Sequence, residues 1–248
     1  MNSESSKILQ PAKLITGLQG SPLNLAILQE QVVECRRCPR LIDHCRQVAE
    51  RKRRAFADWE YWGRPVPSFG DPKARVLIIG LAPGAHGSNR TGRMFTGDGS
   101  GEFLYAVLHQ TGFASQPTAV SREDGLGLTD LYITAAVRCA PPGNKPSAEE
   151  FANCRPYLER ELELLANVRI VVSLGKLAHD AYLGILHSRG AIRVLSDYPF
   201  GHNRRHQLPD GLPLLISSYH PSRQNTQTGR LTAAMFRRVF QAVRRALA

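Results

Sequence analysis

The stretch that decides the fold is residues 75–101, which read RVLIIGLAPGAHGSNRTGRMFTGDGSG. It begins as a continuous apolar run and changes at Gly80 into a loop rich in glycine and polar residues. A short apolar run without alternation is typical of a strand that is buried on both faces. Glycines directly after such a strand let the backbone approach a ligand closely. The stretch therefore predicts a buried strand followed by a binding loop.

Similar apolar runs and helical patterns alternate along the rest of the chain. The predicted strands cover 74–80, 131–139, 169–175 and 213–220, and the predicted helices cover 22–34, 100–112, 147–166, 176–186 and 229–248. Ser147 and Glu150 form a capping box at the start of one helix. Strand–helix alternation is typical of a parallel sheet covered on both sides. We therefore predict a three-layer α/β/α fold around a central, mostly parallel, four-stranded sheet.

Length and composition predict one domain and a polyanionic partner. The chain has 248 residues, which suits a single domain over 26–248 preceded by a flexible tail over 1–25. No apolar run is as long as a membrane span, and the N-terminus lacks the order of a signal peptide. We expect a cytoplasmic protein that does not bind membranes. The net charge of +11 is typical of a partner such as nucleic acid, or of a well-solvated surface.

A basic stretch lies close to the N-terminus. Residues 45–60 read CRQVAERKRRAFADWE and contain consecutive cations at 51–54. This stretch is either a helix end or an exposed basic stripe, and a solvated surface is the simpler interpretation.

The loops after the predicted strands carry the candidate chemistry, because ligands of open α/β sheets bind beyond the carboxyl ends of the strands. The first loop lacks the G-K-[ST] of a phosphate-binding P-loop and the glycine spacing of a dinucleotide site. Phe95 is either a core residue or a stacking surface for a flat ring. His220 either ends a strand structurally or donates a hydrogen bond to a developing anion. The polar run after it, at 222–230, suits contact with nucleic acid.

The five cysteines predict a metal site. Cys35 and Cys38 form a C-x-x-C, while Cys139 and Cys154 are single and distant. An odd number of cysteines in a cytoplasmic chain argues against a disulfide framework. One close pair and two distant cysteines can enclose zinc or an iron–sulfur cluster, and the spacing does not separate the two. We expect Cys45 to be structural.

Three motifs together resemble the uracil-DNA glycosylase superfamily, and most closely its family 5, the type-b enzymes with an iron–sulfur cluster. The motifs are GLAPGAHGSNRTGRMFTGDGSG, VRCAPPGNKP and YHPSRQNTQTG, and the resemblance runs from about residue 30 to the C-terminus. It implies hydrolysis of the N-glycosidic bond of uracil in DNA, which leaves an abasic site. It also implies a structural 4Fe–4S cluster held by Cys35, Cys38, Cys139 and Cys154, which we expect to lie far from the base pocket.

The resemblance also assigns roles to individual residues. His220 would donate to the base oxygen, and Phe95 would stack on a base that has left the helix. The base pocket would be formed by Gly80, Ala82, Gly84, His86, Phe95 and Ala135. Ser222, Arg223, Gln224 and Asn225 would enter the DNA minor groove. Independently of the resemblance, we expect the basic residues Arg90, Arg93 and Arg138 near the same rim to meet phosphates.

The sequence departs from many relatives at two functional positions. Ala82 and Leu81 stand where other branches carry an acidic or amide residue that positions water. Asn89 is the remaining polar candidate for that role, and Asp98 is a weaker one because an N-cap is its simpler role. Ala135 stands where several branches carry an asparagine that reads uracil. Loss of such an amide relaxes selectivity, so we expect activity on hypoxanthine and xanthine as well.

Other functions explain fewer of these features. A non-catalytic nucleic-acid-binding module with the same cluster would explain the missing polar residues, but not His220 and Phe95. An electron-transfer protein would leave the basic loops unused. A small-molecule enzyme that binds phosphate at the glycine loop would leave the 220–230 motif unexplained. We expect a monomer that acts on DNA containing uracil or other deaminated bases, in the nucleoid if the source is a prokaryote.

Overall fold

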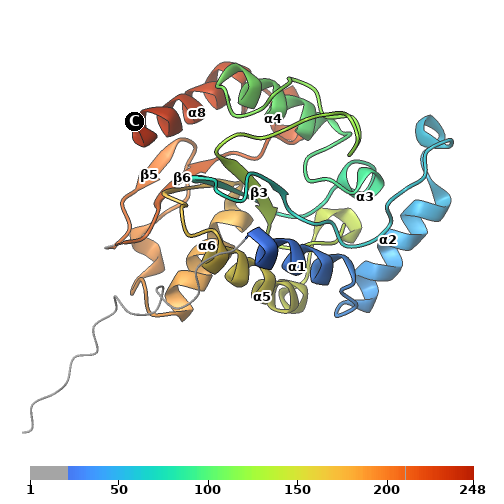
Figure 1. Cartoon of the computed structure of the whole chain (residues 1–248), viewed down its shortest axis with the longest axis horizontal. Helices are drawn as coiled ribbons and strands as arrows, with labels where there is room; N and C mark the ends of the chain where they lie inside the picture. Colours follow the sequence, from blue (N-terminus) through green and yellow to red (C-terminus); the bar gives the residue numbers. More distant parts are fainter. Residues whose placement is uncertain (1–21, 210) are drawn as a thin grey trace, which may run out of the picture.

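A twisted six-stranded sheet forms the centre of the molecule (Figure 1). The computed structural model describes residues 22–209 and 211–248. The strands are β1 (Phe69–Gly70), β2 (Val76–Gly80), β3 (Leu131–Ala135), β4 (Ile170–Leu174), β5 (Arg204–His206) and β6 (Leu214–Ser218), in the order β1-β3-β2-β4-β6-β5. The central strands β3, β2, β4 and β6 are parallel, which confirms the predicted sheet. The antiparallel edge strands β1 and β5 were not predicted, because two or three residues carry no readable periodicity.

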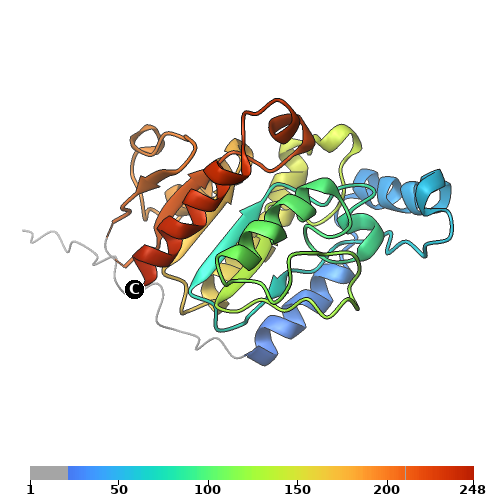
Figure 2. The same ribbon diagram turned by 90° about the horizontal axis from the view of Figure 1, so that it is seen from above.

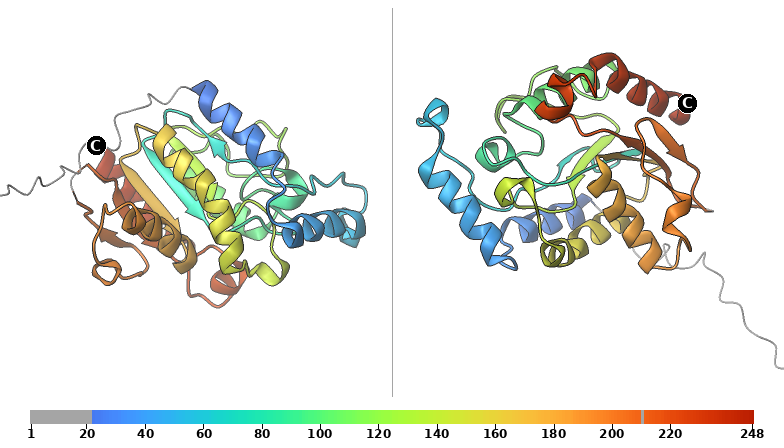
Figure 3. Two further views of the ribbon diagram at one scale, coloured as in Figure 1. Left: turned by 90° about the horizontal axis from the view of Figure 1, so that it is seen from below. Right: turned by 180° about the vertical axis from the view of Figure 1, so that it is seen from behind.

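Helices cover both faces of the sheet and complete the predicted three layers (Figures 1 and 3). One layer contains α1 (Pro22–Val33), α5 (Ala148–Leu164) and α6 (Lys176–Ser188), and the other contains α4 (Gly99–Gln110) and α8 (Ala233–Leu247). Alternate residues of a strand point to opposite faces. In β2, Val76 and Ile78 therefore join the core under α4 and α8, while Leu77 and Ile79 join the core under α1, α5 and α6. Burial on both faces explains the continuous apolar runs in the sequence.

Several helices and helical turns were not predicted from the sequence, except that a helix end was one of the two alternatives for the basic stretch. The basic stretch belongs to α2 (Pro39–Arg51) and to a single 3-10 turn at Arg54–Phe56. The polar loops contain α3 (Ser88–Thr91) and α7 (Arg223–Gln227), and two further 3-10 turns lie at Pro142–Asn144 and Leu195–Asp197. Helices of four or five residues are too short to show an amphipathic period, so only their end signals remain in the sequence.

The N-terminal boundary lies earlier than expected. Helix α1 begins at Pro22, so residues 22–25 are part of the folded domain rather than of a tail. The remainder of the predicted tail, residues 1–21, lies outside the described residues. Within the part of the chain that the structure describes, none of the helices is both long and apolar enough to cross a membrane.

Three arginines that were expected to meet phosphates are instead buried within the fold. Arg90, Arg93 and Arg138 are each less than 5% exposed. Arg93 forms a bidentate pair with Asp124, at 2.8 and 2.7 Å. Arg138 pairs with Glu161, which is itself fully buried. The expectation was wrong because charged side chains can be buried when partners satisfy them, and a single sequence does not reveal those partners.

The Arg138–Glu161 pair belongs to a buried polar network between β3, α5 and the segment before β1. Thr134 donates to Glu161 at 2.6 Å, and Ser68 donates to the same carboxylate at 2.6 Å. Gln29 of α1 also donates to it, at 2.9 Å. The network thus links α1, the sheet and α5 through one carboxylate.

Replacing Arg138 should leave this carboxylate charged and without its cation. We expect Arg138→Met to lower the free energy of unfolding by about 3–5 kcal/mol, because removing one partner of a buried pair leaves an uncompensated charge. The matched control is Arg160→Met, which breaks the exposed i,i+3 pair with Glu163 and should cost less than about 1 kcal/mol. Urea unfolding of both variants measures the difference. Equal losses of unfolding free energy would contradict the role of Arg138 as the cation that compensates the buried Glu161 carboxylate.

Candidate active site

The carboxyl ends of the parallel strands bring the candidate residues to one edge of the sheet (Figure 2). Gly80 ends β2, Ala135 ends β3, and His220 follows β6 by two residues. Gly175 follows β4 with a φ of +94°, and a Cβ built on it would lie 3.4 Å from that of His220. The structure thus brings the predicted site residues together at one edge of the sheet, and it adds Gly175, which the sequence analysis did not include.

Phe95 and His220 form the centre of this site. Their ring centroids are 5.8 Å apart, with an interplanar angle of 31°. The Phe95 ring also lies on Gly80, where a Cβ would come within 2.9 Å of Phe95 Cζ. Phe95 is 9% exposed, so it is at once a core residue and part of the site surface. Glycine is therefore needed at position 80 for contact with the ring rather than for an unusual backbone angle.

The backbone of Phe95 is strained and tightly held. Its φ is +52°, a region that bulky residues rarely adopt. The carbonyl of the preceding Met94 accepts a 2.8 Å hydrogen bond from the hydroxyl of Tyr105 on α4. A Cβ on Gly101 would lie 1.7 Å from the Phe95 carbonyl oxygen. The start of α4 therefore fixes the ring in place before any ligand arrives.

The His220 ring is neutral at physiological pH. Burial lowers its pKa to about 4. Among the described residues, no side chain hydrogen-bonds to the ring nitrogens of His220. A neutral imidazole carries one N–H donor and one acceptor nitrogen. The ring can therefore offer its N–H to a ligand without first releasing another partner.

Asp98 faces the glycine loop while it caps α4. Its Oδ1 accepts from the backbone amides of Ser100 and Gly101, both at 3.0 Å, so the expected N-cap is confirmed. Its Oδ2 lies against the loop, where a Cβ would come within 2.8 Å on Gly84 and 2.0 Å on Gly87. Burial raises the pKa of Asp98 above its usual value. One carboxylate oxygen is thus structural, and the other is available to the site.

The two polar loop residues His86 and Asn89 are engaged mainly by the protein itself. His86 Nδ1 is 3.0 Å from the hydroxyl of Tyr61. Asn89 is fully buried, and its Nδ2 donates to the carbonyls of Cys45 at 3.3 Å and Ala85 at 3.4 Å. Its Oδ1 has no hydrogen-bond partner among the described residues. Asn89 therefore supports the loop from behind and has one free acceptor.

The predicted DNA-binding residues form the first turn of α7. The Ser222 hydroxyl caps this helix by accepting from the Asn225 amide, and the Asn225 Nδ2 donates to the His220 carbonyl at 2.8 Å. The side chains of Arg223 and Gln224 are exposed, and the Arg223 side chain lies over Gly99. Two of the four residues therefore hold the His220 segment, and the other two face outward.

The cysteines gather behind the glycine loop. Cys38, Cys139 and Cys154 share a small core with Cys45. Cys35 is half-buried at the end of α1. Ala82, predicted to line the base pocket, packs against the same small core. The chain after β3 runs beside the turn after β2, where the amides of Ala136 and Val137 donate to the carbonyls of Gly80 at 3.0 Å and Leu81 at 2.9 Å.

The environment of the cysteines suits ligands of a cationic group. Burial raises the pKa of Cys38 and raises that of Cys154 to about 11, so an added positive charge is needed to hold these thiolates. N–H donors already point at two of the sulfurs, from Asn153 to Cys38 at 3.6 Å and from the Arg138 backbone to Cys154 at 3.4 Å. The Cys45 thiol instead donates to the Ala140 carbonyl at 3.7 Å.

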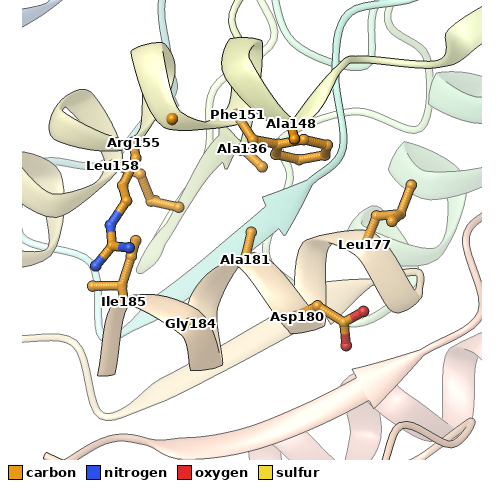
Figure 4. Close-up of a pocket in the computed structure, with 11 residues that line it drawn as sticks. Ala136, Ala148, Phe151, Arg155, Leu158, Leu177, Asp180, Ala181, Gly184 and Ile185 are labelled. Carbon is orange, nitrogen blue, oxygen red and sulfur yellow. The ribbon is translucent and has the colours of Figure 1, made fainter. Parts of the chain in front are cut away.

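A separate groove of about 410 Å³ lies between α5 and α6, in the helical layer that also contains α1 (Figure 4). Figure 4 shows Phe151, Leu158 and Leu177 along its walls, with Arg155 and Asp180 near its rim. Neither Phe95 nor His220 lines it. The candidate site is therefore defined by converging strand ends rather than by this groove.

The pKa of His220 makes the stability of the protein sensitive to acid. Between pH 6.5, the usual pKa of histidine, and about pH 4, His220 is protonated in the unfolded chain but not in the folded protein. The free energy of unfolding therefore falls as the pH drops through this window. We expect His220→Gln to reduce this loss, because the proton uptake disappears. Urea unfolding on either side of the window measures the effect. His187→Gln, at an exposed histidine of α6, is the control and should keep the loss of the native chain.

Known proteins resemble this chain over most of its length. The family described as the uracil DNA glycosylase superfamily matches residues 67–244. A type-5 uracil-DNA glycosylase of Thermus thermophilus is 52% identical over 87% of this chain and 95% of the relative. Enzymes of the same name from Mycobacterium leprae and Pyrobaculum aerophilum are 48% and 46% identical, over 90% and 82% of this chain and 96% and 84% of the relatives. The chain therefore belongs to the uracil DNA glycosylase superfamily, in its type-5 branch.

Proposed function

We propose that this protein is a DNA-repair enzyme that hydrolyses the N-glycosidic bond of uracil in DNA and leaves an abasic site. The observation that carries the proposal is the pairing of a rigid Phe95 ring with the neutral His220 ring at the carboxyl end of the sheet. The type-5 uracil-DNA glycosylases named above support the same reaction. The proposal also accounts for the net charge of +11, which suits a polyanionic substrate.

The target base would bind against Phe95. Chemistry on a base requires the nucleotide to leave the helical stack. The fixed ring offers a flat surface for the base, and the absence of side chains at Gly80 and Gly84 lets backbone amides approach its edge. Ala135 and His86 would complete the pocket, while Ala82 would contribute only backbone because its side chain packs against the cysteines.

His220 would stabilise the departing base. When the glycosidic bond breaks, negative charge develops on the base and positive charge on the sugar. The N–H of the neutral imidazole would donate to the base oxygen, and this hydrogen bond would become stronger as negative charge develops on the base. Asn225 holds the carbonyl of His220, and Gly175 leaves room beside its Cβ, so the ring is oriented in advance.

Asp98 is the stronger candidate for positioning the attacking water. Its Oδ2 faces the glycine loop, and its buried carboxylate can accept a hydrogen bond from water. Asn89 uses its amide hydrogens on the carbonyls of Cys45 and Ala85, so only its Oδ1 could contribute. The sequence signal for Asp98 was ambiguous because an N-cap needs just one of the two carboxylate oxygens.

The pocket and the rim suggest how substrates are chosen. The Ala135 side chain places no hydrogen-bonding group at the end of β3, so hypoxanthine and xanthine should be accepted beside uracil. Arg223 and Gln224 would contact the DNA, with Ser222 and Asn225 supporting them from the first turn of α7. One chain supplies all these groups, which is consistent with a monomer acting in the cytoplasm on chromosomal DNA.

The decisive test is base release from oligonucleotides that contain uracil, followed by alkaline cleavage at the abasic site. We expect His220→Ala and Asp98→Asn to slow single-turnover release by about 10²–10³-fold each, as for removal of one stabilising group in other enzymes. Arg223→Gln should mainly raise the DNA concentration that is needed for the half-maximal rate. Matched oligonucleotides with hypoxanthine test the relaxed pocket. DNA binding without any base release would favour a non-catalytic binding module instead.

The cysteine site would hold a structural 4Fe–4S cluster. Cys35, Cys38, Cys139 and Cys154 would be its ligands, and the cluster would join the α1–α2 turn to β3 and α5. Tetrahedral zinc would place four sulfurs about 3.8 Å from one another. Over residues 22–209 and 211–248, no three Cys, His, Asp or Glu side chains are arranged for a single metal ion, so the choice of an iron–sulfur cluster rests on the resemblance to family 5.

Loss of one ligand should remove the cluster. We expect Cys154→Ser to lose the iron, the acid-labile sulfide and the visible absorbance of the purified chain, and to unfold at lower urea concentration. Cys45→Ser is the matched control, because a serine hydroxyl can still donate to the Ala140 carbonyl. Zinc instead of iron in the native chain would contradict the cluster.

A further inference from the structure

The basic stretch that the sequence left unexplained forms a projecting arm beside the active site. We define the Arg-rich arm as residues 51–64, from the last residue of α2 to Arg64. It projects from the body beyond α2 and returns toward α3 (Figure 1). Its cations are Arg51, Lys52, Arg53, Arg54 and Arg64, against the acidic residues Asp58 and Glu60.

The arm is fastened to the glycine loop by Arg90. The Arg90 guanidinium lies between the rings of Phe56 and Trp59, 3.9 and 4.0 Å from their centroids. The same guanidinium donates to the carbonyls of His86 at 2.8 Å and Gly97 at 2.7 Å. One buried side chain thus holds the arm and both ends of the loop that carries α3.

Further contacts repeat this connection. The backbone amides of Trp62 and Gly63 donate to the carbonyls of Arg90 at 2.9 Å and Asn89 at 3.0 Å. The Tyr61 hydroxyl is bonded both to His86 Nδ1 and to the Arg53 amide, which donates to it at 3.3 Å. The positive charge of Arg53 also helps to lower the pKa of His86, after burial, so the cationic end of the arm lies close to the loop.

The outward side of the arm is cationic and unneutralised. Arg51, Arg53 and Arg54 are exposed. In the described part of the chain, none of the three forms an ion pair with an acidic side chain. A rigid run of unpaired cations beside the site matches the phosphates of a nucleic acid, which present about one charge per 1.7 Å of duplex axis.

The aromatic residues of the arm indicate that its ligand is duplex DNA rather than single-stranded DNA. Single-strand binders stack bases on free aromatic rings. Here Phe56 and Trp59 already cover Arg90, and Trp62 lies between Arg64 and Arg122, at 3.9 and 4.5 Å. The arm therefore offers charge rather than stacking surfaces, as a contact to a duplex backbone requires.

We propose that the Arg-rich arm binds the phosphate backbone of the DNA duplex on one side of the target nucleotide, opposite the side that α7 contacts. Figure 2 shows the arm and α7 on either side of the loop that carries α3. This inference rests on the proposed function for its substrate. It adds a second DNA contact whose position is coupled through Arg90 to the loop that receives the base.

The test is the salt dependence of binding to a duplex with a stable abasic analogue. We expect Arg53→Gln/Arg54→Gln to weaken binding about tenfold and to reduce the slope of log Kd against log salt by about two, one for each lost phosphate contact. The matched control is Lys73→Gln/Arg169→Gln, which removes the same charge at the other end of β2 and β4 and should keep the native slope.

Shortened duplexes locate the contact. Removing base pairs on the side that the arm contacts should weaken the binding of the native chain and abolish the difference in affinity between the native chain and the arm variant. Removing base pairs on the other side should preserve that difference. An unchanged slope in the arm variant, or an equal change in the control, would overturn the proposal. Because binding is measured without base release, a chain that binds through the arm but releases no uracil would refute the proposed function alone.

Discussion

The contact of the Phe95 ring with Gly80 and His220 is the interaction on which the site depends. It joins three segments that are distant in the sequence: the end of β2, the start of α4 and the turn after β6. The ring can lie there only because Gly80 has no side chain and because Phe95 adopts a φ of +52°. The strain is held by the close approach of Gly101 to the Phe95 carbonyl. A planar surface beside a neutral imidazole is thus built into the folded chain before substrate binds.

The glycine loop is also held from the side that faces the protein interior. Asn89 donates to Cys45, Ala82 packs on the small cysteine core, and Arg90 spans the loop from His86 to Gly97. These contacts leave the backbone of the loop exposed toward the site while its larger side chains point into the protein. Preorganisation of this kind avoids reorganisation when charge develops during the reaction. The proposed cysteine site would therefore support the base pocket through packing.

Three arginines near the candidate site do not face solvent. Arg138 neutralises the buried Glu161 carboxylate, and Arg93 pairs with the half-buried Asp124. Arg90 joins two aromatic rings to the glycine loop. We propose that exposed cations of the arm and of α7, such as Arg54 and Arg223, contact the DNA instead. Net charge in the sequence thus indicated the class of partner correctly, whereas the choice of contacting residues depended on which guanidinium groups the fold had already used.

The sequence by itself determined the layered α/β fold, the four parallel strands and the edge of the sheet where the candidate residues gather. These follow from local apolar runs and from the rule that parallel strands end at one edge. Its motifs also supplied Phe95, His220 and the four cysteines as candidate site residues. Only the tertiary structure decided that Asp98 has a second oxygen facing the loop, that Ala82 packs on the cysteines, and that Arg90 fastens the arm. Each of these depends on contacts between segments far apart in the chain, which periodicity and spacing do not encode.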